Sequence, residues 1–243
     1  MPTVGLLYPG VGAEDDFPQL EARLGGDLRL PVVHTSVGED AHRVDALLDL
    51  GATGRLAEGA KTLIEEHHPD SIMWACTSGS FVFGWDGAHE QVRELQARTG
   101  VPTSSTSLAF VEACRALSIR RVSVAASYPQ DVAEHFVTLL GRGGIAVTAL
   151  GSHGIITAAA VGTLGYEQVE AIATGAAVSG GAEAVLIPDT AMHSLQWIDS
   201  LEAAIGLPVL TANQVTVWQG MRLLGDVPRY ETLGTLFRTP SRG

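Results

Sequence analysis

In the run SIMWACTSGS, residues 71–80, a cysteine comes directly after a short apolar stretch. Small hydroxyl residues and a glycine follow the cysteine. Residues 71–75 have the pattern of a buried strand, and the residues after Cys76 predict a loop. In an open α/β sheet, ligands bind beyond the carboxyl ends of the strands, where loop amides and helix N-termini hold anions. The stretch therefore predicts an α/β fold with a reactive thiol at the end of a strand.

The rest of the chain alternates apolar, strand-like runs with longer amphipathic runs. Strands are expected at residues 4–8, 30–35, 101–106, 121–127, 145–150, 184–187 and 208–210. Helices are expected from residue 14 onward and at 54–67, 88–99, 108–117, 130–140, 166–175, 198–205 and 213–224, with an irregular tail after Asp226. This alternation predicts parallel sheets that are covered by helices on both faces.

Three short stretches recur in the same order in the two parts of the chain. The matching pairs are residues 7–9 with 127–129, 72–77 with 185–190, and 100–102 with 206–208. We therefore predict two pseudosymmetric, Rossmann-like α/β half-domains, residues 1–106 and 107–212, with the active site in the cleft between them. The last segment, 213–243, is expected to pack back on the first half. In this register Asp189 is the counterpart of Cys76.

The composition is that of a globular protein, since 46% of the 243 residues are hydrophobic. The formal charge of −12 and the lack of a run of Lys or Arg argue against binding to nucleic acid or to an anionic membrane surface, because both need clustered cations. The expected partners are small molecules. The oligomeric state, including a homo-oligomer, is left open.

The start of the chain enters a strand-like run at once, without the basic and apolar segments of a secretory signal. No apolar stretch approaches the roughly 18 residues of a membrane span, so we expect a cytoplasmic protein. Cys76 and Cys114 are the two cysteines. Two are too few for a disulfide scaffold or a four-thiolate zinc site, so both are expected to be free thiols.

The histidines and the first glycine-rich turn give no signature of a metal or cofactor. His34, His153 and His193 lie near strand or loop ends that border the predicted cleft, whereas residues 67–68 precede a proline and are expected to be solvated. None has the spacing of a metal site with Cys or Glu. The glycines in residues 10–12 do not form a dinucleotide-binding fingerprint. We therefore expect neither a bound metal nor a nucleotide cofactor.

Several stretches together resemble a known superfamily. They are residues 76–78, 105–107, 115–117, 120–122, 126–128, 152–155 and 206–210. The chain is similar in these stretches to the aspartate/glutamate racemase superfamily, in particular to its branch containing arylmalonate decarboxylase and maleate cis-trans isomerase. The resemblance implies two α/β halves around a cleft, no cofactor, and one cysteine from each half beside the substrate. Cys76 matches the first cysteine, but Pro188-Asp189-Thr190 stands where the second would be.

Cys76 is the first candidate catalytic residue. An unperturbed thiol titrates near ~8.5, and a helix N-terminus can lower that pKa, so Cys76 is predicted to act as a nucleophile or proton carrier at neutral pH. The alternative is a small buried hydrophobic residue at a strand end. Cys114 lies within an apolar helical pattern and is expected to pack in the core.

Hydroxyl groups near the predicted cleft are candidates for substrate binding. The resemblance implies that Thr77, Ser78 and Tyr128 bind a carboxylate and stabilise the enediolate that forms from it. Helix capping is the alternative for Thr77 and Ser78. Tyr128 could simply close its strand, but its match to Tyr8 makes both tyrosines cleft candidates, together with Pro9.

Asp189 is the candidate partner of Cys76. A carboxylate lacks the nucleophilicity of sulfur but can move protons, especially where an apolar cleft raises its pKa. The equally favoured alternative is an N-cap for the segment that follows, and Thr190 is a candidate donor beside it. Because Asp15, Asp16 and Asp189 are expected near the substrate, a dianion such as maleate would be repelled unless these groups face solvent or are protonated.

Three functions follow from these residues. The favoured one is a cofactor-independent isomerase or racemase, similar to maleate cis-trans isomerase, acting on a small carboxylic acid that has a cationic or neutral second group. Cys76 is its nucleophile or proton carrier, Asp189 is the acid/base partner, and a pocket of hydroxyls and amides stabilises the enediolate. The first alternative is a decarboxylase in which Cys76 delivers the proton from the opposite face. The second is a non-enzymatic protein that binds a small carboxylate, although a pure binder has no use for a reactive thiol.

Overall fold

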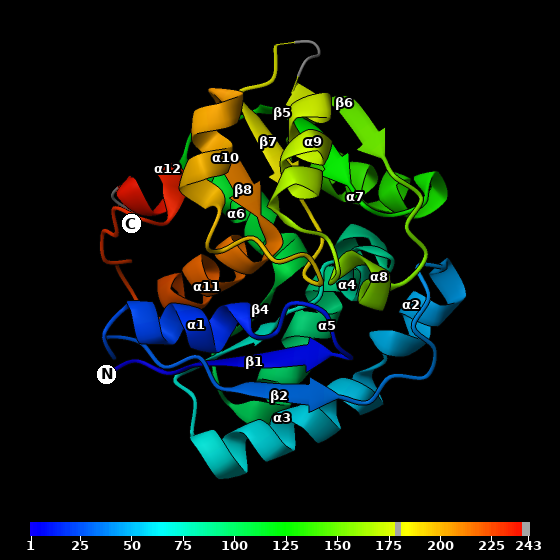
Figure 1. Ribbon diagram of the computed structural model, residues 1–243. Coiled ribbons are helices and arrows are strands. Elements are labelled where there is room, and N and C mark those ends of the chain that lie inside the picture. Colours follow the sequence, from blue (N-terminus) through cyan, green and yellow to red (C-terminus); the bar gives the residue numbers. More distant parts are fainter. Residues whose placement is uncertain (178–180, 240–243) are drawn as a thin grey trace.

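The computed structural model of the protein describes residues 1–177 and 181–239. Its framework consists of two four-stranded parallel sheets. Figure 1 shows how the two sheets are arranged. The first sheet has the order β2-β1-β3-β4 and the second the order β6-β5-β7-β8. The strands of the first sheet are β1 Val4–Pro9, β2 Val32–Thr35, β3 Ser71–Trp74 and β4 Thr103–Ser105. Those of the second are β5 Arg121–Ala126, β6 Ala146–Ser152, β7 Ala184–Ile187 and β8 Val209–Thr211.

Helices cover both faces of the two sheets (Figure 1). They are α1 Asp16–Arg23, α2 Val44–Leu50, α3 Thr53–His67, α4 Ser78–Phe81, α5 Gly84–Thr99, α6 Thr106–Ala116, α7 Gln130–Arg142, α8 Ala158–Val161, α9 Tyr166–Ala177, α10 Ile198–Ile205, α11 Ala212–Arg222 and α12 Gly234–Arg238. Within residues 1–177 and 181–239, no helix combines the length and apolar character that a membrane span needs.

The predicted fold class is confirmed, because the two sheets repeat one strand order. β1 and β5 are paired in the same way with the strands that follow them, and β3 and β7 occupy equivalent positions. Even the helix ends match: Gly100 ends α5 with a φ of 70° and Gly206 ends α10 with a φ of 73°. Glycine suits both positions because this left-handed conformation strains residues that carry a Cβ.

Four short helices were not predicted. α2, α4 and α8 have seven, four and four residues, too few for a clear helical periodicity. The expectation of an irregular tail after Asp226 is wrong at α12, which buries Leu236 and Phe237. Its first turn is held by Glu202, whose carboxylate accepts from the amide of Thr235 at 2.9 Å. Such a helix depends on tertiary contacts that a local pattern does not contain.

One hydrophobic core runs through both halves of the chain. It includes Tyr8 and Phe81 from the first half and Tyr128 and Phe136 from the second, all at most 1% exposed. The outer face of each sheet has a smaller core of its own. The division at residue 106 stays a prediction. In the last segment, α11 packs on α6, on β1, β3 and β4 of the first sheet and on β8 of the second, and α12 contacts α10 and β8.

Asp16 joins three segments at the interior end of α1. Its Oδ2 accepts hydrogen bonds from the amides of Ser194 at 3.0 Å and Leu195 at 3.2 Å, and from Nδ2 of Asn213 at 3.0 Å. Burial raises the pKa of the carboxyl, and these three donors oppose that rise. Asp16 therefore ties the first half to a loop of the second half and to α11.

We predict that Asp16→Ala lowers the free energy of unfolding by about 3 kcal/mol, because it leaves buried donors unpaired. Urea denaturation measures the change. The matched control is Asp15→Ala, which removes a half-exposed carboxylate beside His193 and should change stability by less than about 1 kcal/mol. Equal effects of the two substitutions would show that the three hydrogen bonds of Asp16 do not hold the segments together.

Candidate active site

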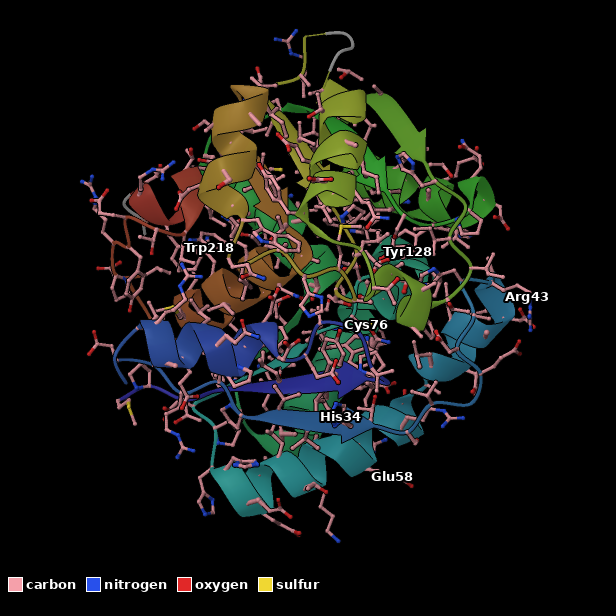
Figure 2. The ribbon with its side chains drawn as sticks, in the orientation of Figure 1. His34, Arg43, Glu58, Cys76, Tyr128 and Trp218 are labelled. Carbon is pink, nitrogen blue, oxygen red and sulfur yellow. The ribbon has the colours of Figure 1, made fainter. Side chains whose placement is uncertain are left out.

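A cavity of about 130 Å³ lies beyond the carboxyl ends of β1, β3 and β7. Figure 2 shows Cys76 and Tyr128 near the centre of the molecule, between the two sheets. Six of the predicted site residues line the cavity, namely Tyr8, Pro9, Cys76, Ser78, Asp189 and Thr190. The other two, Thr77 and Tyr128, are fully or almost fully buried and are not part of its lining.

Cys76 lies two residues after β3 and is 3% exposed. The amide of Gly79 donates to its Sγ at 3.3 Å, and the Ser78 hydroxyl lies 3.8 Å from the sulfur. Burial nevertheless raises the pKa of the thiol to about 12, and the charge of Asp189 adds to the rise. The prediction of a lowered pKa is therefore wrong for this cavity, because loss of hydration outweighs the nearby donors. At neutral pH, Cys76 is a neutral thiol.

Asp189 lies two residues after β7, at the position equivalent to that of Cys76. Its Oδ2 accepts a hydrogen bond from the hydroxyl of Ser127, and its Oδ1 accepts one from the amide of Ala191 at 2.9 Å. The bond to Ala191 closes a local turn of the kind that Asp commonly forms two residues ahead. The next helix, α10, begins at Ile198, so this contact is a turn and not the N-cap of the alternative. Asp189 also lines the cavity with Cys76, and its acid/base role stays a prediction.

Two buried tyrosines hold the turn that carries Asp189. The Tyr8 hydroxyl donates to the carbonyl of Thr190 at 2.9 Å and accepts from the amide of Ala13 at 3.0 Å. The Tyr128 hydroxyl donates to the carbonyl of Pro188 at 2.8 Å. Each phenol has one proton, so both protons are used within the protein. Burial raises the pKa of both tyrosines, so they remain neutral donors that position this turn.

The hydroxyl residues after Cys76 differ in their surroundings. Ser78 faces the cavity, whereas Thr77 is fully buried behind it. Thr77 does not cap α4 with its side chain, and its Oγ1 has no hydrogen-bond partner in the described part of the chain. Its backbone carbonyl accepts from the hydroxyl of Ser107 at 2.7 Å. The side chains of Thr77 and Ser78 lie near the phenol of Tyr128 and lower its pKa, although burial raises that pKa more strongly.

Of the three carboxylates expected near the substrate, Asp189 lines the cavity and Asp15 and Asp16 do not. Asp15 is turned toward His193, with Oδ1 2.7 Å from Nε2, and Asp16 is held in the network described above. Neither belongs to the cavity lining. The expectation that both stand near the substrate is therefore wrong. The reason is that α1 turns its first residues toward the loop at 193–195.

Glu39 and Asp40, rather than Asp15 and Asp16, line the cavity. Asp40 accepts from the amides of Ala158 at 2.8 Å and Ala159 at 3.1 Å, and Glu39 pairs with Arg43 at 3.0 Å. Among the described residues, no lysine or arginine lines the cavity. The lining therefore combines apolar side chains with acidic ones and is unfavourable for a dianion.

His42 is a site residue that the sequence did not reveal. It lines the cavity and is 7% exposed, while His34, His153 and His193 are absent from the lining that the described residues form. Its Nδ1 lies 2.7 Å from the carbonyl oxygen of Ile155. Residues 36–53 had no predicted element, so nothing in the local pattern placed this histidine near Cys76.

Comparisons with known proteins agree with this geometry. The sequence model of a family described as arylmalonate decarboxylase matches residues 50–237. The chain is 26% identical to the maleate isomerase of Nocardia farcinica over 235 residues, which cover 93% of this chain and 90% of that protein. It is 28% identical to the arylmalonate decarboxylase of Bordetella bronchiseptica over 230 residues, covering 92% and 91%.

A crystal structure of the maleate isomerase Iso from Pseudomonas putida S16 has the same fold. It superposes with a TM-score of 0.87 and covers 98% of each chain. The sequence identity in this superposition is 21%. At that level, the match establishes the two-sheet architecture alone.

The raised pKa of Cys76 predicts a specific pattern of alkylation. Iodoacetamide should react slowly with Cys76 at pH 7 and faster as the pH rises toward about 12, because the thiolate is the reactive form. Cys114 should lag behind at every pH, since it is fully buried and does not line the cavity. Mass spectrometry of the two cysteine peptides measures both rates. Labelling of Cys76 at pH 7 as fast as that of glutathione would contradict the raised pKa.

Proposed function

The chain belongs to the arylmalonate decarboxylase family, within the superfamily of Asp/Glu racemase-like proteins, and from this premise we propose a cofactor-independent isomerase or racemase that acts on a small carboxylic acid. Its characterised relatives are enzymes, a maleate isomerase and an arylmalonate decarboxylase. In the proposed reaction the substrate passes through an enediolate, and Cys76 delivers a proton to its α-carbon.

The observation that carries this proposal is the buried, neutral thiol of Cys76, which lines the cavity together with Ser78 and Asp189. With a pKa of about 12, the thiolate is on the order of one molecule in 10⁵ at pH 7. A route that begins with attack of sulfur on a double bond needs that rare form. Proton donation to an enediolate uses the form that is already present. The site therefore favours the proton-carrier role of Cys76 over the nucleophilic one.

Donors next to Cys76 support an enediolate intermediate. The hydroxyl of Ser78 lines the cavity and lies 3.8 Å from the sulfur of Cys76. Donors that are fixed in a dry pocket stabilise developing negative charge on a carboxylate, and one such donor contributes about 3 kcal/mol to the transition state. The apolar side chains of Val37, Leu47 and Leu50 help to exclude water from the same space.

The charges around the cavity support a substrate with one carboxylate. Glu39, Asp40 and Asp189 line the cavity, and the lining that the described residues form has no cationic side chain of Lys or Arg. Maleate carries two negative charges, and both would lie near these carboxylates, of which Asp189 is buried whereas Glu39 and Asp40 are exposed. We therefore propose a monocarboxylic acid whose second substituent is neutral or cationic.

Decarboxylation is the second candidate, and the same thiol favours it. Loss of CO₂ from a malonate leaves an enediolate, and one neutral thiol is enough to protonate it. The family match and the 28% identical relative add to this candidate. It stands second because an arylmalonate is a dianion and meets the same acidic lining.

Proton NMR in D₂O separates these reactions. The probes are maleate, phenylmalonate, and single enantiomers of 2-phenylpropionate, mandelate and alanine. The proposal predicts deuterium at the α-carbon of a monocarboxylic acid together with inversion of its configuration. Deuterated product from phenylmalonate with release of CO₂ would establish the decarboxylase instead, and fumarate from maleate would establish the double-bond isomerase.

We predict that Cys76→Ala lowers turnover by about 10³-fold or more while the protein stays folded. Circular dichroism and thermal melting check the fold, and the NMR assay measures turnover. Cys114→Ala is the matched control, because it removes a thiol of similar burial outside the cavity and should retain activity. Full activity of Cys76→Ala would show that Cys76 is not the proton donor.

A further inference from the structure

His42 occupies a fixed position at the junction of the two halves. It lies in the segment between β2 and α2, and its backbone amide donates to the carbonyl of Ile156 at 2.8 Å. Two residues earlier, Asp40 caps the first amides of α8 through Ala158 and Ala159. The segment that carries His42 is thus held against residues 155–159 of the other half, and its side chain reaches the cavity.

The imidazole ring has a defined tautomer. Nδ1 lies 2.7 Å from the carbonyl oxygen of Ile155, which can only accept, so Nδ1 carries a proton. In the neutral ring the lone pair is therefore on Nε2. The ring meets the Tyr128 ring edge to face, with centroids 4.8 Å apart and an interplanar angle of 86°. The printed side-chain contacts of His42 within residues 1–177 and 181–239 involve Nδ1 and the ring face, which leaves Nε2 as the acceptor of an oriented ring.

A reaction that inverts an α-carbon needs one group to remove the proton and another to return it. The neutral thiol of Cys76 can return a proton but cannot take one. We infer that His42 is the second acid/base group of the cavity and that its Nε2 takes the α-proton of the substrate. This inference rests on the proposed function.

Asp189 is the competing base, and its contacts argue against it. Both of its oxygens already accept hydrogen bonds, from Ser127 and from Ala191. The other carboxylates of the lining are also engaged, Asp40 by backbone amides and Glu39 by Arg43. The remaining titratable groups that face the same cavity are the phenol of Tyr8 and the thiol of Cys76, and the phenol of Tyr128 contacts the ring. Imidazole is the side chain in this set that both accepts and donates protons near neutral pH.

The proton cycle closes without another reactant. The lone pair of Nε2 takes the α-proton, the C–H bond breaks, and its electron pair moves into the carboxylate to give the enediolate and an imidazolium. The S–H bond of Cys76 then breaks as its proton forms a new C–H bond, which leaves a thiolate. The proton of the imidazolium finally passes to sulfur and restores both groups. The substrate and the product have the same composition, as an isomerisation requires.

The test uses His42→Asn, because the amide of asparagine can still donate to the carbonyl of Ile155. For an acid that the NMR assay identifies as a substrate, kcat should fall roughly 10²–10³-fold while KM stays within about threefold. His135→Asn on α7, a histidine outside the cavity lining, is the matched control and should retain activity. A kcat of His42→Asn within twofold of the wild-type value, or loss in Asp189→Asn alone, would overturn the inference.

A second measurement needs no substrate. In a Cys114→Ala background, the rate at which iodoacetamide alkylates Cys76 is measured between about pH 5 and 8. Without a titrating neighbour, the rate should fall about tenfold per pH unit as the thiolate disappears. An imidazolium in the same cavity favours the thiolate, so a wild-type slope that is shallower than tenfold and that His42→Asn restores to tenfold would show that the two groups interact.

The two measurements separate the two proposals. A shallow wild-type slope that depends on His42, with no reacting acid in the panel, would count against the proposed function and support the acid/base pair. Identical slopes in the wild type and His42→Asn would overturn the pair, whatever the substrate. If His42→Asn fails to fold, the wild-type protein alone provides the test. An alkylation rate of Cys76 that falls tenfold per pH unit over the whole range would reject the acid/base pair of His42 and Cys76.

Discussion

The burial of reactive side chains between the two sheets is the constraint on which the site depends. It raises the pKa of the Cys76 thiol and of the Tyr8 and Tyr128 phenols, so all three groups are neutral at pH 7. A neutral group can donate a proton or a hydrogen bond but cannot attack as an anion. The fold therefore sets the type of chemistry before any substrate is present.

These side chains are buried because the halves are joined by polar contacts as well as by a shared core. The Tyr8 hydroxyl reaches across to Thr190, and Asp40 reaches across to α8. Close approach reinforces these contacts, since a Cβ at Gly12 would lie 2.7 Å from the Cβ of Ala191. Each contact fixes a residue that lines the cavity. The site is thus a property of the junction rather than of either sheet alone.

The sequence predicted the two sheets and the positions of Cys76 and Asp189, because an internal repeat places both residues two positions after equivalent strands. It did not predict the raised pKa of Cys76, since burial by the second half is not visible in a local motif. His42 was missed for a related reason. Its role depends on a carbonyl at Ile155, more than a hundred residues away. Local patterns determine strands and turns, whereas hydration and long-range partners determine the chemistry.

An imidazole base would also resolve the conflict between an acidic lining and a negatively charged intermediate. Removal of the α-proton by a carboxylate such as Asp189 would convert that carboxylate to a neutral acid while the enediolate gains charge. Transfer to His42 instead forms a cation in the same cavity as the new anion, and opposite charges attract strongly where water is excluded. Glu39 and Asp40 would then stabilise the imidazolium. The same acidic side chains that disfavour a dianionic substrate would therefore favour proton transfer to this histidine.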